Sequence, residues 1–212
     1  MIIGFHLSWT TYGHWFPNDP RGSWSHEIWK PDLAKVRPLD NGHKIGQRRP
    51  VAKAELQEFL DSARAELRWK TVNLSTEERA VVADAFREAA HATGLIIRAC
   101  AILYNHVHII VDRPVGSYER VVNRLKGRSS QAIRAYRNIS PSPNRRHRVP
   151  IWTRGYWCRY IDNPEYMEHA IRYVQEHNME QKPFHRQLRP VGRASPADQN
   201  REYERAARRQ VK

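Results

Sequence analysis

Two histidines two residues apart, His106 and His108, are the side chains in this sequence best placed to do chemistry. They lie in segment 105–110 (NHVHII), whose apolar and β-branched residues predict a strand. Residues i and i+2 of a strand point to the same face, about 6 to 7 Å apart along the backbone, so both imidazoles could bind one metal ion. Val107 and Ile109 would then point the other way, into a core. The pair could equally be two histidines that bind no metal.

A tyrosine and a third histidine follow near the end of the chain. Segment 164–178 has apolar residues at helical spacing, and Tyr173 and His177 lie four residues apart, so they fall on one side of the predicted helix. A phenol one turn from an imidazole suits a nucleophile that works beside a metal ion. Tyr173 could instead only pack at the edge of the core, and His177 could be a favourable cation near the end of the helix.

The positive charge of the chain is concentrated in one segment. The formal net charge is +14, and residues 116–160 hold eleven Lys or Arg against the single acid Glu119. Such an excess predicts a polyanionic partner, and nucleic acid fits better than an anionic membrane surface because no amphipathic anchor is visible. Single strands bind to cationic tracks combined with aromatic platforms. The residues expected to contact the nucleic acid are Arg120, Arg124, Lys126, Arg128, Arg154, Trp152 and Trp157.

These residues need a scaffold, and the hydrophobic pattern predicts one. Alternation or apolar runs predict strands at 3–10, 95–103, 106–111 and 151–160, and helical spacing predicts helices at 52–69, 75–94, 116–136 and 163–178. Ser75 and Glu78 form a capping-box pattern, and Asn163 followed by Pro164 predicts another helix start. The order of elements predicts an α+β domain, with a mainly antiparallel sheet and helices packed against it.

The length of 212 residues suits one core. Residues 1–180 are expected to form a single domain, with an irregular Pro- and Gly-containing insertion at about 21–50, and residues 181–212 a flexible basic tail. Cys100 and Cys158 form no CxxC motif, so reduced thiols in the cytoplasm are expected. A protein that binds DNA is expected to associate there with the nucleoid. No apolar run approaches the ~18 residues of a membrane span, so no membrane partner is expected.

Four motifs of the chain resemble the HUH single-strand DNA transposases with one catalytic tyrosine, in particular the REP-associated tyrosine transposases. They are the hairpin 105–108 (NHVH), the opening block 10–16 (TTYGHWF) with 19–22 (DPRG), the tripeptide 125–127 (LKG) and the helix segment 170–174 (AIRYV). The matches run in the family's order over residues 1 to about 180. Two features depart from the pattern: no proline follows Asn178, and the 21–50 segment is longer than expected.

The resemblance implies a ferredoxin-like or RRM-like sheet, known as the HUH endonuclease fold. It implies that His106, His108 and His177 hold a divalent ion, Mg²⁺ or Mn²⁺, and that Tyr173 attacks single-stranded DNA to give a 5′-phosphotyrosine. Imidazole ligands alone would suit Mn²⁺, Co²⁺ or Ni²⁺ better than Mg²⁺. The expected partner is single-stranded or hairpin DNA from a repeat, bound by a monomer or a homodimer, and the expected process is DNA transposition.

Three other functions are compatible with parts of the sequence. One is a catalytically inactive nucleic-acid-binding protein of the same fold, and another is a rolling-circle or mobilisation nickase of the same superfamily. The third is a 2H phosphoesterase, which needs two His-x-Thr/Ser motifs on strands. The segments 6–8 (HLS) and 91–93 (HAT) match that pattern, although the second falls at the end of a predicted helix.

Overall fold

The computed structural model describes residues 1–23, 28, 30–39, 50–139 and 148–180, and the structural statements below concern these residues. Four strands form one sheet in the order β2-β3-β1-β4, and all neighbours are antiparallel. The strands are β1 (Gly4–Thr10), β2 (Ile97–Ile102), β3 (His106–Asp112) and β4 (Trp157–Ile161). This strand order, with helices inserted between β1 and β2 and between β3 and β4, is the ferredoxin-like arrangement. The predicted α+β fold with an antiparallel sheet is confirmed.

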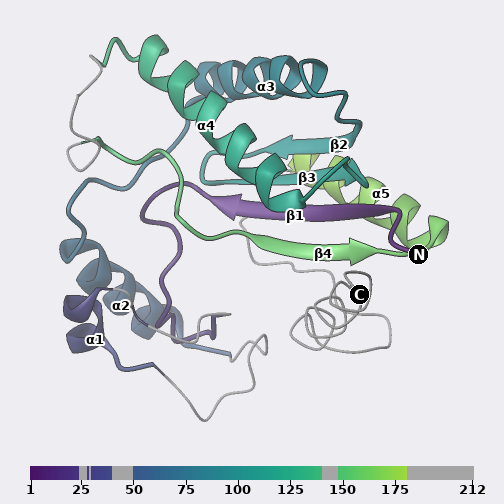
Figure 1. The fold of residues 1–212 in the computed structure, drawn as a ribbon. Coiled ribbons are helices and arrows are strands. Elements are labelled where there is room, and N and C mark those ends of the chain that lie inside the picture. Colours follow the sequence, from purple (N-terminus) through teal and green to yellow (C-terminus); the bar gives the residue numbers. More distant parts are fainter. Residues whose placement is uncertain (24–27, 29, 40–49, 140–147, 181–212) are drawn as a thin grey trace, which may run out of the picture.

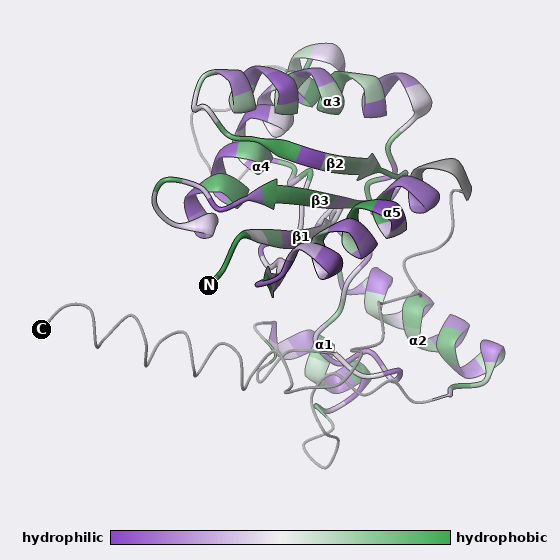
Figure 2. Ribbon diagram, turned by 90° about the vertical axis from the view of Figure 1, so that its right-hand side faces the viewer, coloured by the Kyte–Doolittle hydropathy of each residue, from purple (hydrophilic) through white to green (hydrophobic). Residues whose placement is uncertain are grey.

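Helices cover both faces of the sheet. The helices α3 (Thr76–His91) and α4 (Tyr118–Tyr136) pack together on one face, and α5 (Pro164–Glu180) packs mainly on β2 and β3 of the other (Figure 1). Figure 2 views the sheet from the α5 side, and the strands are mostly hydrophobic. Because side chains alternate along a strand, β3 sends Val107, Ile109 and Val111 into the core under α3 and α4, while Ile110 packs under α5.

The predicted helix starts are confirmed by hydrogen bonds. The Ser75 hydroxyl accepts from the Glu78 backbone N–H, and the Glu78 carboxylate accepts from the Ser75 backbone N–H, which is a complete capping box. At the start of α5, the Asn163 side-chain oxygen accepts from the Tyr166 backbone N–H at 2.7 Å. The predicted strand 151–160 is only partly correct, because β4 begins at Trp157 and Trp152 forms only an isolated bridge with Thr11.

A small helical lobe lies beside one end of the sheet (Figure 1). It contains α1 (Pro31–Val36) and α2 (Lys53–Ala65), and it has its own core of Phe16, Leu33, Phe59 and Ala63. The helix α1 falls in the segment where we predicted only irregular chain. Residues 24–27, 29, 40–49 and 140–147 and the predicted tail 181–212 lie outside the described residues, so the domain boundary near 180 stays a prediction.

A glycine in β1 allows α5 to approach the sheet. A Cβ on Gly4 would lie 2.5 Å from Met167 Cε on α5 and 2.6 Å from the backbone oxygen of Val111 on β3. A larger residue would therefore meet the end of the Met167 side chain and, more rigidly, the backbone of β3, the strand that carries His106 and His108. Of the helices in the described ranges, none is long and apolar enough to cross a membrane.

Candidate functional site

The three predicted histidines come together between β3 and α5. His106 and His108 point toward α5, as the i, i+2 spacing predicts, and their ring centroids are 5.1 Å apart. The His177 ring, from α5, lies 6.1 Å from His106 and 5.1 Å from His108. The three are 0%, 6% and 3% exposed, and one ring nitrogen from each lies within 4.8 Å of the others. This buried set could hold one metal ion.

The partners of two of these rings favour metal binding. His106 Nδ1 lies 2.6 Å from Asn105 Oδ1, and His108 Nδ1 lies 3.0 Å from His6 Nε2, so Nε2 is the nitrogen that each ring would offer to an ion. Burial, followed by the charges of His6, His106 and His177, holds the pKa of His108 well below its usual range. A neutral imidazole is the form that binds a metal, and a set of nitrogen donors suits Mn²⁺, Co²⁺, Ni²⁺ or Zn²⁺. The residues present therefore fit a divalent ion.

Tyr173 lies beside the histidines on α5. Its ring centroid is 4.7 Å from that of His177, one helical turn away, and 5.7 Å from that of His108. The side chain is half-buried, so it borders the cluster and is reached from solvent. A phenol at this position could attack a group bound at the same point.

Three other tyrosines near the end of the chain, Tyr156, Tyr160 and Tyr166, have different surroundings. The Tyr166 ring lies under the Arg159 guanidinium, 4.6 Å from its carbon, and its hydroxyl is buried. Tyr160 contacts the Tyr118 hydroxyl at 3.3 Å, and Tyr156 packs near Lys126. Both of the latter therefore lie against the α4 side of the sheet, away from the histidines.

Sequence reasoning did not include His6 and Trp157 in the histidine cluster. His6 is 1% exposed, and its ring lies 5.2 Å from His108, 5.1 Å from Trp157 and 6.1 Å from Tyr173. The alternation of the first strand could have indicated His6, because Phe5, Leu7 and Trp9 point to one face and His6 must then point to the other, the face of His106 and His108. A 2H phosphoesterase would need its second His-x-Thr/Ser motif on a strand, but His91, which begins that motif here, is the last residue of the helix α3. That alternative is therefore wrong.

The basic residues are split between two roles. Arg120, Arg124 and Arg128 are exposed and spaced four residues apart, so they form a stripe along α4, on the face of the sheet opposite the histidines. Arg154 is exposed in the loop before β4. The Lys126 ammonium instead donates to the backbone oxygens of residues 153, 154 and 155 at 2.9, 3.3 and 2.7 Å, and burial lowers the pKa of Lys126 to about 7. Lys126 ties α4 to this loop.

The two tryptophans expected to stack on bases also differ. Trp152 is 6% exposed, its indole N–H donates to Ser129 Oγ at 3.0 Å, and its ring packs at 88° to Trp9. It belongs to the core and presents no face to DNA. Trp157 is half-buried on the α5 side, next to His6. Of the pair, only Trp157 is placed beside the histidines.

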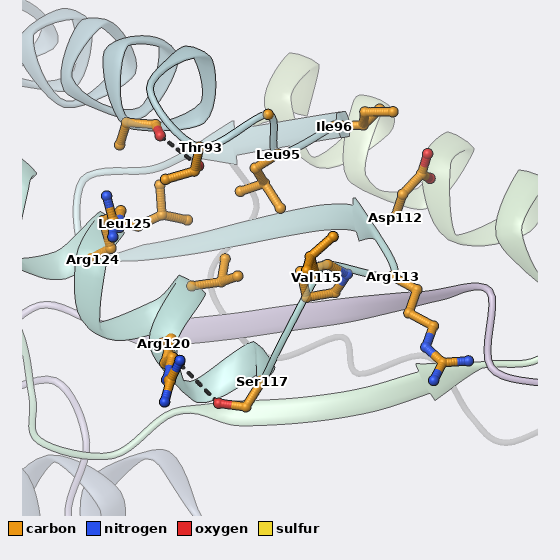
Figure 3. Close-up of a pocket in the computed structure, with 14 residues that line it drawn as sticks. Thr93, Leu95, Ile96, Asp112, Arg113, Val115, Ser117, Arg120, Arg124 and Leu125 are labelled. Carbon is orange, nitrogen blue, oxygen red and sulfur yellow. Dashed lines mark hydrogen bonds between the residues drawn. The ribbon is translucent and has the colours of Figure 1, made fainter.

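A cavity of about 260 Å³ lies at the other end of β3, between the C-terminal end of α3 and the start of α4. Apolar residues such as Leu95 and Leu125 line it together with Arg113, Arg120 and Arg124 (Figure 3). None of the three histidines, nor Tyr173, lines this cavity. The hollow therefore belongs to the arginine side of the molecule and is separate from the histidine cluster.

Comparison with known proteins places this chain in a family. The model of the IS200-like transposases matches residues 48–177, which is more than half of the sequence. A candidate transposase from Deinococcus radiodurans R1 is 14% identical, with 84% of this chain and 92% of that chain covered and a TM-score of 0.40. A REP-associated tyrosine transposase bound to a REP hairpin is 11% identical, with 85% and 69% covered and a TM-score of 0.44. No curated protein matches significantly. From the match of the family model, this chain is a member of the IS200-like transposase family.

Proposed function

We propose that this transposase-family chain cleaves and rejoins single-stranded DNA, with Tyr173 as the nucleophile and His106, His108 and His177 as the ligands of a divalent cation. The observation that carries the proposal is the meeting of three buried imidazoles with a phenol whose ring lies 4.7 Å from one of them. The strand β3 and the helix α5 supply these groups from rigid elements, which fixes their relative positions.

The chemistry follows from what each group can do. When bound, the ion would polarise the scissile phosphate and offset the charge that develops on its oxygens. The Tyr173 oxygen attacks phosphorus in line as its phenol loses a proton, a tyrosine–phosphorus bond forms, and the bond from phosphorus to the 3′ oxygen breaks. The 3′ oxygen takes up a proton and leaves as a free hydroxyl, while the 5′ end remains on the tyrosine. The reverse reaction, with a new 3′-hydroxyl, joins strands without an external energy source.

We further propose that the substrate is a hairpin-forming repeat flanked by single strand. An enzyme that acts on single strands needs an element to recognise that persists without a partner strand, and a hairpin is such an element. The stripe of Arg120, Arg124 and Arg128 lies on the face opposite the histidines. DNA bound to both surfaces would pass around the edge strand β4, where Trp157 and Arg159 point to the histidine side.

A covalent-trapping experiment tests this function. The purified protein, with Mn²⁺ or Mg²⁺, is incubated with a hairpin oligonucleotide that has only a short stretch of single strand on the 5′ side of the cleavage position and a label on the 3′ side. The short 3′-hydroxyl fragment that cleavage releases diffuses away, which prevents rejoining and leaves the labelled strand on the protein. We expect a denaturant-resistant adduct whose peptide maps to Tyr173, and no adduct for Tyr173→Phe or in the presence of chelator. Tyr166→Phe, on the same helix, is the matched control and should retain the adduct.

Two results would contradict the proposal. Hairpin binding with no adduct under any metal condition would identify a catalytically inactive DNA-binding protein. An adduct that forms equally well in Tyr173→Phe would mean that another residue is the nucleophile.

A further inference from the structure

The proposed chemistry does not use His6, although the His6 ring is buried directly against the histidine cluster. It comes from β1, is 1% exposed, and places Nε2 3.0 Å from Nδ1 of His108. Its own Nδ1 is buried and has no hydrogen-bond partner in the described part of the chain. His6 therefore has one polar contact to a side chain there, and that contact is to a proposed metal ligand.

The direction of this hydrogen bond decides what His108 can do. A neutral imidazole carries one proton, so one ring nitrogen donates and the other can accept or bind a metal. If His6 donates, the proton of His108 lies on Nε2, and that nitrogen has no lone pair for an ion. If His108 donates from Nδ1, its Nε2 lone pair is available on the side where His106 and His177 approach. Only the second arrangement is compatible with a metal held by all three rings.

His106 has a partner of the same kind. Its Nδ1 lies 2.6 Å from Oδ1 of Asn105, a residue that is 8% exposed. An amide oxygen can only accept, so His106 must donate from Nδ1 and keep its lone pair on Nε2. Metal-binding histidines usually donate their second N–H to an acceptor that fixes the ring and its tautomer. Asn105 fills that role for His106, and His6 is in the equivalent position for His108.

His6 is placed to accept the proton of His108. Its Nε2 is the ring nitrogen that faces Nδ1 of His108, at 3.0 Å, across the pairing of β1 with β3. An imidazole that carries its single proton on Nδ1 has a lone pair on Nε2 and can accept there. In this arrangement His108 donates and His6 accepts.

We propose that His6 is a positioning residue that accepts the Nδ1–H of His108 and so holds His108 in the tautomer whose Nε2 can bind a divalent cation. The inference rests on the proposed metal-dependent function of the same histidines. It adds a fourth histidine, from a different strand, whose task is to orient a ligand and not to bind the ion.

The tautomer can be measured without metal and without activity. Long-range ¹H–¹⁵N NMR spectra of the metal-free, ¹⁵N-labelled protein report which nitrogen of each histidine carries the proton. We expect His108 protonated at Nδ1 and His6 unprotonated at Nε2 in the wild type. In His6→Gln the side-chain oxygen can accept the same hydrogen bond, so His108 should keep its tautomer, whereas in His6→Met it should shift toward Nε2–H.

Calorimetric titration with Mn²⁺ or Co²⁺ gives the second measurement. Loss of a partner of this kind costs about 10- to 100-fold in metal affinity, so His6→Met should bind more weakly by that factor. His6→Gln should stay within about threefold of the wild type, because the acceptor is restored. Backbone amide spectra of both variants show whether each is folded.

The inference would be overturned by a wild-type spectrum in which His108 carries its proton on Nε2, or by a folded His6→Met variant that binds metal as tightly as the wild type. If His6→Met does not fold, the wild-type spectrum alone decides the direction of the hydrogen bond. A wild-type protein that binds no divalent ion and forms no tyrosine adduct would refute the proposed function instead. That outcome is distinguishable because the tautomer is read from the metal-free protein.

Discussion

The arginine stripe of α4 (Arg120, Arg124 and Arg128) should determine how strongly DNA binding weakens with salt, whereas Lys126 of the same helix should not contribute. Arg120, Arg124, Arg128 and Arg154 are exposed in this region, whereas Lys126 donates to three backbone oxygens. Each phosphate neutralised on a single strand adds about −0.7 to the slope of log K against log salt. Four contacts give a slope of about −2.8, so affinity should fall about 50-fold between about 50 and about 200 mM salt.

The test replaces Arg120, Arg124 and Arg128 together by Gln and measures binding to a labelled single-stranded oligonucleotide by fluorescence anisotropy over that salt range. Three lost contacts should make the slope shallower by about 2, for all sequences alike. The matched control Lys126→Met should keep the wild-type slope, even where its loss of three hydrogen bonds lowers thermal stability.

Two outcomes would refute this reasoning. A triple variant with an unchanged slope would mean that the DNA backbone lies on another surface. A Lys126→Met variant that flattens the slope as much as one arginine substitution would mean that the ammonium leaves its carbonyl partners to bind phosphate. The difference between slopes is the deciding quantity, because basic residues outside the described ranges contribute equally to the wild type and the variants.

Three further predictions concern stability. The first concerns His6, whose pKa is about 3 in the folded state against an ordinary 6.5. With chelator present, protonation of His6 in the unfolded chain should lower the free energy of unfolding by about 2 kcal/mol between about pH 7 and about pH 5. In urea denaturation, His6→Gln should lose about 2 kcal/mol less than the wild type over this pH range, and an equal loss would contradict the explanation. Gly4→Ala should cost about 1 to 3 kcal/mol and lower Tm, because the new Cβ would lie 2.6 Å from the backbone oxygen of Val111 and 2.5 Å from Met167 Cε. An unchanged Tm would show that these neighbours move aside at little cost. Glu78→Gln should cost about 2 kcal/mol at neutral pH, because it weakens the ion pair in which Arg137 Nε lies 2.5 Å from Glu78 Oε1. This ion pair holds the pKa of Glu78 below its usual range, so the stability difference from the wild type should shrink in acid as Glu78 is protonated. A stability difference that does not change with pH would contradict the ion-pair explanation.

Local patterns in the sequence were sufficient for most elements and for the direction of several side chains. Alternation predicted that His106 and His108 share a face of β3, and the four-residue spacing predicted that Tyr173 and His177 share a side of α5. The Ser75 capping box was readable because it satisfies backbone groups within one turn. These features depend on neighbours a few residues apart, so the sequence alone carries them. The resemblance of the motifs to a transposase family added the expectation that these groups meet.

Tertiary structure decided which of the chemically suitable residues share a surface. His6 and His108 are 102 positions apart, and only the pairing of β1 with β3 brings their rings into hydrogen-bond distance. Trp152 has the residue type of a DNA-stacking platform but is 6% exposed, and Lys126 has the charge of a phosphate contact but is held by the loop 153–155. The type of a residue determines which chemistry its side chain can perform. Distant segments of the chain determine whether that side chain is buried or already bonded, and so whether it is available. Strand pairing and the packing of α5 bring those distant segments together, and spacing along the chain cannot encode their separation in space.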